Sequence, residues 1–255
     1  MVVSALSFWL GTCAIHQRIT KILCMKKYGF AIVGSIVVLL SACNNSKISD
    51  NEKKGIKEVV SLYGGKVKYS KEDSAAVKKN VFEIDLSKSR FADRYTDNPE
   101  LPASGVAYAF YKKLGNDKQK YTHIKCKLLL SDGEKVDYEY PVNELELVSS
   151  KMKIAVKITD LIKQRNFNAI KPMLDDSSYA QYNKDEFIKN LEETDLQYAK
   201  VNELIIVGYR FYKIYGKDIL HISGQLMRGA QANAFSIDID PNDVQERAVM
   251  INYTI

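Results

Sequence analysis

Histidine is scarce in this sequence, with three residues in 255, and tryptophan occurs once. Only His123 and His221 lie beyond the apolar N-terminal segment, and they fall in different halves of the chain. A zinc site needs three or four clustered ligands, and no spacing of that kind occurs. Motifs for a serine nucleophile elbow, a glycine-rich phosphate loop and a dinucleotide fingerprint are also absent. We therefore expect no metal and no cofactor, and no motif assigns a catalytic residue.

Charge of one sign is not concentrated in the body of the chain. The net charge is +6, but residues 1–42 contain Arg18, Lys21, Lys26 and Lys27 and no acid. From Cys43 onward the chain carries 33 basic and 31 acidic residues. Polyanion binding needs a concentrated basic patch, whereas lysines here alternate with Asp and Glu. Nucleic acid is therefore not an expected partner.

A long uncharged run follows Met25. Two lysines come first, residues 28–42 are uncharged, and the run ends in Leu-Ser-Ala before Cys43. A stable membrane span needs about 20 apolar residues, so this run is short for a span and suits a signal-peptide core. Its end resembles the lipobox of bacterial lipoproteins. The resemblance implies cleavage before Cys43, lipidation of its thiol and membrane attachment through that N-terminal lipid.

The resemblance also carries expectations about location. Two or three acyl chains hold a protein stably on a membrane. Asn44 follows the cysteine, whereas aspartate at that position often marks inner-membrane retention, so the outer membrane is favoured over the inner. The alternative is a plain anchor helix with an incidental Cys43. Residues 1–24 are interpreted as an upstream extension before the signal peptide of residues 25–42, with an additional anchor as the alternative.

Lipidation of Cys43 would leave Cys126 without a disulfide partner, since Cys13 and Cys24 lie upstream of the cut. Cys126 alternates with Ile124 and Leu128 in a strand-like run, so we expect a buried thiol that packs as a small apolar side chain. No disulfide framework is predicted for this protein.

In the first half of the body, the sequence predicts a flexible polar tether over residues 43–55 and then an α+β domain over residues 56–147. A helix is expected from residue 56 to Tyr63, ended by Gly64 and Gly65. The other expected elements are strands at 66–70, 81–87, 121–131 and 135–141 in a short antiparallel sheet, a loop at 87–104, a helix at 107–114, and an Asp-Gly hairpin turn at 131–134.

The second half, residues 148–255, predicts three helices followed by four strands. The first helix carries the apolar stripe Ile154, Ile158, Leu161 and Ile162, the second covers about 168–174, and Asn183 opens the third. Strand-like runs at 200–214, 217–228, 231–239 and 244–255 follow, separated by turn residues. This order resembles the NTF2-like superfamily, in which helices pack into a curved four-stranded antiparallel sheet. A cystatin-like fold is the nearest rival.

Three residues of this half are candidate ligand contacts. Histidine side chains titrate near neutral pH in general, and His221 shares a strand face with polar residues, so it could act as a base or contact a ligand. Tyrosine is abundant, with 16 residues, and Tyr209 and Tyr253 lie on strands that could line a groove. The simpler interpretation is that both tyrosines pack within the sheet and that His221 is a structural histidine. The acids from Asp238 to Asp243 lack the pattern of a calcium loop and are expected to form a turn.

We therefore expect a lipid-anchored protein of the cell envelope that acts as a noncatalytic binding or assembly module. Its partner would be an envelope protein or a small ligand. The alternative is a small-molecule enzyme, such as an isomerase, dehydratase or hydrolase, with its pocket inside the second sheet. A desolvated acid or histidine in that interior would favour the enzyme, and apolar and aromatic walls would favour the binding module.

Overall fold

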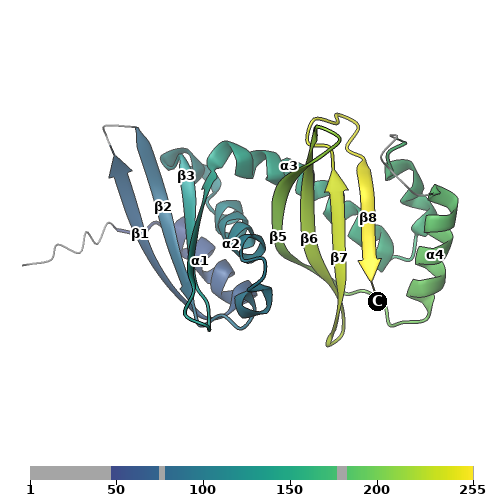
Figure 1. Cartoon of the computed structure of the whole chain (residues 1–255), viewed down its shortest axis with the longest axis horizontal. Helices are drawn as coiled ribbons and strands as arrows, with labels where there is room; N and C mark the ends of the chain where they lie inside the picture. The colour runs from purple at the N-terminus through teal and green to yellow at the C-terminus, as the bar shows by residue number, and fades with distance from the viewer. Residues whose placement is uncertain (1–46, 75–77, 177–182, 255) are drawn as a thin grey trace, which may run out of the picture. The chain divides into compact units, whose positions relative to one another are not determined.

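The computed structural model describes residues 47–74, 78–176 and 183–254. The expected signal peptide, the lipobox and Cys43 lie outside the described residues. The described chain is an α+β protein with two four-stranded sheets, one in the order β1-β2-β3-β4 and the other in the order β5-β6-β7-β8 (Figure 1). Residues 45–255 form one compact unit. The α+β fold class is therefore confirmed.

The chain opens with helix α1 (Asp50–Tyr63), which begins earlier than the apolar spacing predicts. Ser49 Oγ accepts the Glu52 N–H at 3.2 Å, and Glu52 Oε2 accepts the Ser49 N–H at 2.8 Å. This capping box satisfies two N–H groups that a helix start leaves unpaired. Residues 50–55 therefore belong to the helix and not to a flexible tether, which corrects that part of the interpretation. Gly64 ends the helix with φ 65°, as expected.

The first sheet is mixed and not purely antiparallel. Its strands are β1 (Lys66–Ser74), β2 (Lys79–Ser87), β3 (His123–Leu129) and β4 (Lys135–Pro141). Strands β2 and β3 pair in parallel, while the other pairs are antiparallel. The expectation of an antiparallel sheet was wrong here because a helix, and not a hairpin, connects β2 to β3.

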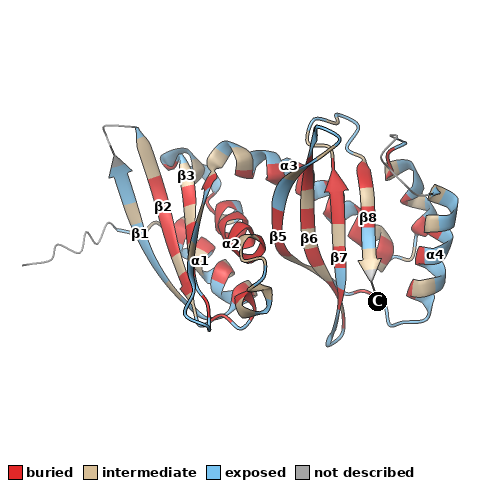
Figure 2. Cartoon of the chain, viewed as in Figure 1, coloured by how far each residue is buried: buried red, intermediate tan, exposed pale blue. Residues whose placement is uncertain are grey.

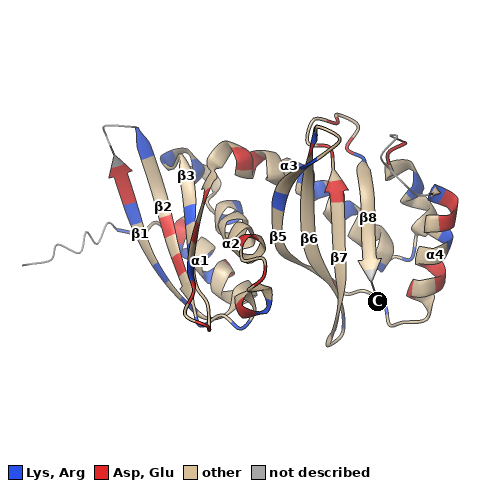
Figure 3. Ribbon diagram, in the orientation of Figure 1, with Lys and Arg blue, Asp and Glu red and all other residues tan. Residues whose placement is uncertain are grey.

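That connecting helix is α2 (Glu100–Lys113), and most of it is buried (Figure 2). Its first turn includes Pro102, inside the stretch expected to be a loop. The first N–H groups of a helix have no intrahelical acceptor, so proline is tolerated there. Phe110 of α2 stacks on Phe82 of β2, with ring centroids 4.3 Å apart. The apolar face of the first sheet is thereby packed against helices, while its other face carries charges of both signs (Figure 3).

The second half begins with α3 (Val142–Lys163), which is longer than its apolar stripe predicts. Two 3-10 turns, Phe167–Ala169 and Lys171–Met173, take the place of the expected second helix. Helix α4 (Lys184–Leu196) begins as predicted, because Asn183 accepts the N–H groups of Asp185 and Glu186. The four strands of the antiparallel meander are β5 (Glu203–Ile214), β6 (Lys217–Arg228), β7 (Gln231–Ile239) and β8 (Ala248–Thr254).

One buried apolar cluster contains side chains from both sheets and from the helices between them. Helix α2 lies along the free edge of β5, where a bulge falls between Ile206 and Gly208. A Cβ on Gly208 would lie 1.7 Å from the Leu101 carbonyl oxygen, so only glycine allows this approach. The expected domain boundary at residues 147/148 falls inside α3, and the division into two domains stays a prediction.

Candidate functional site

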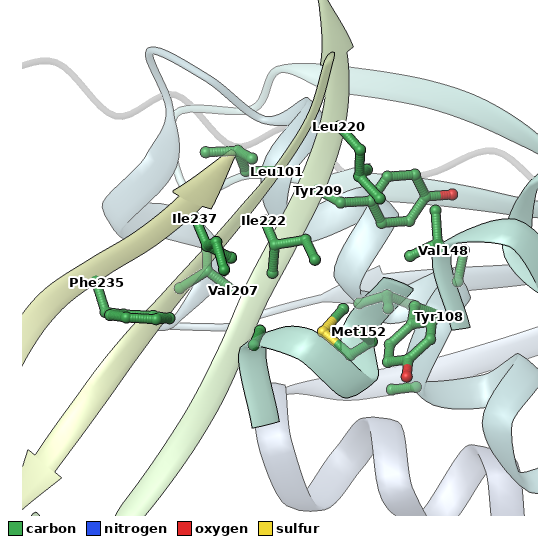
Figure 4. Close-up of a cluster of buried hydrophobic side chains, with 14 of the residues drawn as sticks. Leu101, Tyr108, Val148, Met152, Val207, Tyr209, Leu220, Ile222, Phe235 and Ile237 are labelled. Atoms are coloured by element: carbon green, nitrogen blue, oxygen red, sulfur yellow. The ribbon is translucent and has the colours of Figure 1, made fainter. Parts of the chain in front are cut away.

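Tyr209 lies in β5 on the sheet face that packs against α3, and it is 1% exposed. Its hydroxyl donates to Glu144 Oε1 at 2.9 Å, and its backbone N–H donates to Ser104 Oγ at 2.8 Å. Figure 4 shows the ring among buried apolar side chains, with Val148 and Leu220 nearby. The structure therefore places this candidate ligand contact in the core.

Tyr253 lies on the same face of the second sheet as Tyr209, but its surroundings differ, because its hydroxyl contacts charged side chains. Its hydroxyl contacts Arg228, which also pairs with the fully buried Asp195 of α4. Arg165 donates from Nε to Asp195 Oδ2 at 3.0 Å. Two arginines thus balance one buried carboxylate, and the network fixes α4 against the sheet. Tyr253 completes this network and does not lie beside Tyr209.

His221 lies on the opposite face of the second sheet. Its Nδ1 is 2.7 Å from Oδ1 of Asp238, its cross-strand neighbour on β7. The Tyr212 ring lies edge-on, 6.1 Å from the histidine ring. Burial, and then the hydrogen bond to Asp238, raise the pKa of the Tyr212 hydroxyl. The three candidate residues are therefore not brought together, and His221 does not face the helix-covered side of the sheet.

The His221–Asp238 pair has the arrangement found in general-base catalysis, in which a carboxylate holds one nitrogen of a histidine ring. A carboxylate on Nδ1 fixes the ring and leaves Nε2 for proton exchange. The histidine side chain is 16% exposed and Asp238 is 4% exposed. His221 lines none of the hollows described below, so its ring is not part of an enclosed substrate site among them.

The acids around the β7–β8 connection form a turn, as expected. Asp240 Oδ1 accepts the Asn242 N–H at 2.8 Å, and Asp243 Oδ1 accepts the Gln245 N–H at 2.9 Å. Cys126 is fully buried and unpaired, as predicted, and burial raises the pKa of its thiol. No group of three or more metal-ligating side chains occurs in the part of the chain that the structure describes.

Sequence reasoning missed a small hollow of about 250 Å³ around Glu144. Tyr140, Tyr209 and Glu100 line it together with Glu144. Burial raises the pKa of Glu144, and the nearby Glu100 adds to this, while the Tyr209 hydrogen bond opposes it. A carboxyl with a raised pKa can deliver a proton closer to neutral pH. No local motif could reveal this hollow, because its residues come from α2, α3, β4 and β5.

A second missed feature is a surface groove between α2 and α3. It consists of two adjacent hollows of about 470 and 190 Å³, and we name it the α2/α3 groove. Apolar side chains form much of it, including Met152 and Tyr108, which lie side by side in Figure 4. Val156 is 45% exposed there. The lysines that line the groove are Lys112, Lys153, Lys157 and Lys163.

The lysines of this groove differ in their pairing. Lys163 Nζ is 3.3 Å from Asp160 Oδ1. Lys112, Lys153 and Lys157 form no ion pair with any residue whose placement is described. The groove therefore combines apolar surface with unpaired positive charge, which is the chemistry of a site for an amphipathic anion or an acidic protein segment.

The fold and these surfaces define an α+β protein with a helix-lined groove. No protein family matches the chain, and no curated sequence or solved structure matches it either. Within the described segments no helix is long and apolar enough to cross a membrane.

Proposed function

We propose that this protein is a lipid-anchored binding or assembly module of the cell envelope, without catalytic activity of its own. The anchor is Cys43, and the outer membrane is favoured over the inner. The support for the anchor is the lipobox-like sequence Leu-Ser-Ala-Cys after a short uncharged run. A diacylated or triacylated N-terminus would hold the described body at the membrane surface.

The observation that carries the binding role is the α2/α3 groove. It joins exposed apolar surface at Val156 to three lysines that have no ion-pair partner among the described residues. By contrast, the helix-covered face of the second sheet is filled: Leu220, Ile222 and Ile237 are fully buried (Figure 4). Apolar packing at that interior favours a binding module over a pocket enzyme.

We also propose an NTF2-like relationship for residues 148–255, with a cystatin-like fold as the rival. Helices α3 and α4 precede a four-stranded antiparallel meander, and side chains of both helices are buried against one face of it. The element order supports the relationship. An NTF2-like fold assigns no residue role here, because members of that superfamily share no single catalytic residue.

A small-molecule enzyme is the second candidate, and the hollow at Glu144 is the observation that favours it. The raised pKa of this carboxyl, which burial causes, fits a general acid, whereas the hydrogen bond from Tyr209 favours its ionised form. Glu144→Gln keeps the shape of the side chain and removes the proton. If the chain is an enzyme of this kind, the change lowers its turnover about 10²–10⁴-fold; a binding module keeps its partner.

Crosslinking in the native envelope tests the binding role. A photoreactive residue at position 156 should capture one defined partner, and Lys112→Glu with Lys157→Glu should abolish that capture. The matched control, Lys54→Glu with Lys135→Glu, makes the same change of charge at exposed lysines elsewhere and should leave it intact. Equal capture by both double variants would contradict the binding role of the groove.

A further inference from the structure

We infer that the α2/α3 groove binds an acidic amphipathic helix supplied by a partner protein. This inference rests on the proposed binding function, and it names the site and the chemistry of the partner.

The charge of the groove determines the charge that its partner must carry. Four lysines line the groove, against the two acids Asp160 and Glu203. Asp160 is already paired with Lys163, and Glu203 offsets one of the three remaining lysines, so the groove keeps an excess of two positive charges. Opposite charge on a partner speeds association and fixes its register, whereas a basic partner is repelled.

Shape favours a polypeptide segment over a small molecule. Small ligands bind in pockets that bury 70–90% of their surface, whereas this groove is open to solvent along α2 and α3 and ends at β5. Met152, Val156 and Asp160 line the groove at intervals of four residues along α3, a span of about 12 Å. Met152 is buried at its floor, Val156 is 45% exposed, and Asp160 closes it with a charge paired to Lys163. An apolar stripe of about two turns on a partner helix, with anchors at i, i+3 or i+4 and i+7, matches that length.

Thr159 gives a second, independent indication of a ligand. The residue is 1% exposed and lines the smaller hollow, and its Oγ1 has no hydrogen-bond partner among the described residues. A buried hydroxyl without a partner is unfavourable, because it has lost its hydrogen bonds to water. A hydrogen-bond acceptor on the partner that enters this end of the groove, which Lys112, Lys163 and Glu203 line, would satisfy it.

A designed peptide tests the inference. The probe is a labelled 16-residue helix with leucines at i, i+3, i+4, i+7 and i+11 and glutamate at most other positions. It is titrated with the protein from residue 44 onward, which includes the whole compact unit of residues 45–255. We expect a Kd of about 1–100 μM at low salt that weakens as ionic strength rises, since the charges are exposed.

Three comparisons make the test specific. Lys112→Glu with Lys157→Glu, and separately Val156→Glu, should each weaken binding at least about tenfold, a change of about 1.4 kcal/mol. The control pair Lys54→Glu with Lys135→Glu should leave the Kd within about twofold. A scrambled peptide of the same composition, which keeps the charge and loses the stripe, should bind at least about tenfold more weakly than the designed helix. Thermal unfolding confirms that each variant is folded.

Three results would overturn the inference. They are no saturable binding at 1 mM, equal binding of the scrambled peptide, and equal effects of the groove variants and the control pair. Vesicles containing phosphatidylglycerol provide the remaining arm. If the vesicles bind the protein through Lys112 and Lys157 and the peptide does not bind, a lipid surface occupies the groove. Should the peptide fail while groove-dependent crosslinking in the envelope persists, the binding function stands and only the acidic-helix assignment is lost.

Discussion

Ser104 of α2 and Tyr209 of β5 are 105 residues apart in the sequence, and Ser104 Oγ accepts the Tyr209 backbone N–H at 2.8 Å. The same hydroxyl lies 2.7 Å from the Tyr209 carbonyl oxygen. Nearby, the Tyr63 hydroxyl donates to the Ile206 carbonyl oxygen at 3.1 Å. These bonds satisfy backbone groups on the free edge of β5, which would otherwise be open to pairing with another chain.

Ser104→Ala should destabilise the protein by about 1–3 kcal/mol, because it leaves the buried Tyr209 N–H without an acceptor. Urea unfolding monitored by circular dichroism measures the change. Ser150→Ala is the matched control: Ser150 is exposed on α3 and donates only to its own helix, so its effect should be within about 0.5 kcal/mol. Equal effects of the two changes would show that the β5 edge does not depend on Ser104.

A fragment from Val142 to Ile255 tests the division into two domains while keeping α3 intact. The separate apolar patterns of the two halves predict a cooperative thermal transition for this fragment. The lost contacts with Ser104 and Tyr63 predict that its Tm lies below that of the protein from residue 44 onward. If the fragment unfolds without cooperativity while the protein from residue 44 onward unfolds cooperatively, the two halves share one core and no domain boundary lies near residue 148.

Glu52 should make stability depend on acid pH. Burial alone raises the pKa of this carboxyl, but bonds from Lys71, Tyr121 and the Ser49 backbone outweigh burial and lower it. A lowered folded-state pKa adds stability that is present above the unfolded value of about 4.5 and is lost as pH falls through the folded value. Glu52→Gln should therefore destabilise at pH 7, and its deficit should shrink toward pH 3. A deficit that stays constant over this range would rule out this coupling. Glu193→Gln, at an exposed helix position, should show no such trend.

His221→Gln distinguishes the binding module from an enzyme that uses histidine. We expect partner capture in the envelope to stay nearly unchanged, because His221 lies on the sheet face away from α3 and lines none of the described hollows. A general base would instead be revealed by a fall in turnover of about 10²–10⁴-fold with the fold intact. Tyr209→Ala would not report on binding, because Tyr209 is buried in the core. It would remove a core aromatic ring at a cost of about 3–5 kcal/mol.

Much of the second sheet could be predicted from the sequence, since β6 and β7 have the expected bounds. Strand alternation and turn residues are local signals, and both are clear there. The parallel pairing of β2 with β3 and the early start of α2 were missed, because they depend on packing between distant segments. Prolines 99 and 102 read as loop residues in the sequence, although both fit the start of a helix.

The candidate site was harder to predict for a related reason. Alternation identifies which strand residues share a face, but it does not say which face a helix covers. Tyr209 could therefore be placed on a strand face but not in the core. The lysines of the α2/α3 groove come from two helices that are separated by a hairpin in the sequence, so no local pattern joins Lys112 to Lys157.

Intact-mass analysis of the protein extracted from membranes tests most directly whether this is a lipid-anchored envelope module. We predict a mature chain that begins at Cys43 and carries two or three acyl chains, and the same mature chain when translation starts at Met25. Cys43→Ala should leave an unprocessed precursor without lipid. An N-terminus other than acylated Cys43 in the wild-type protein would contradict the anchor and the assignment to the envelope.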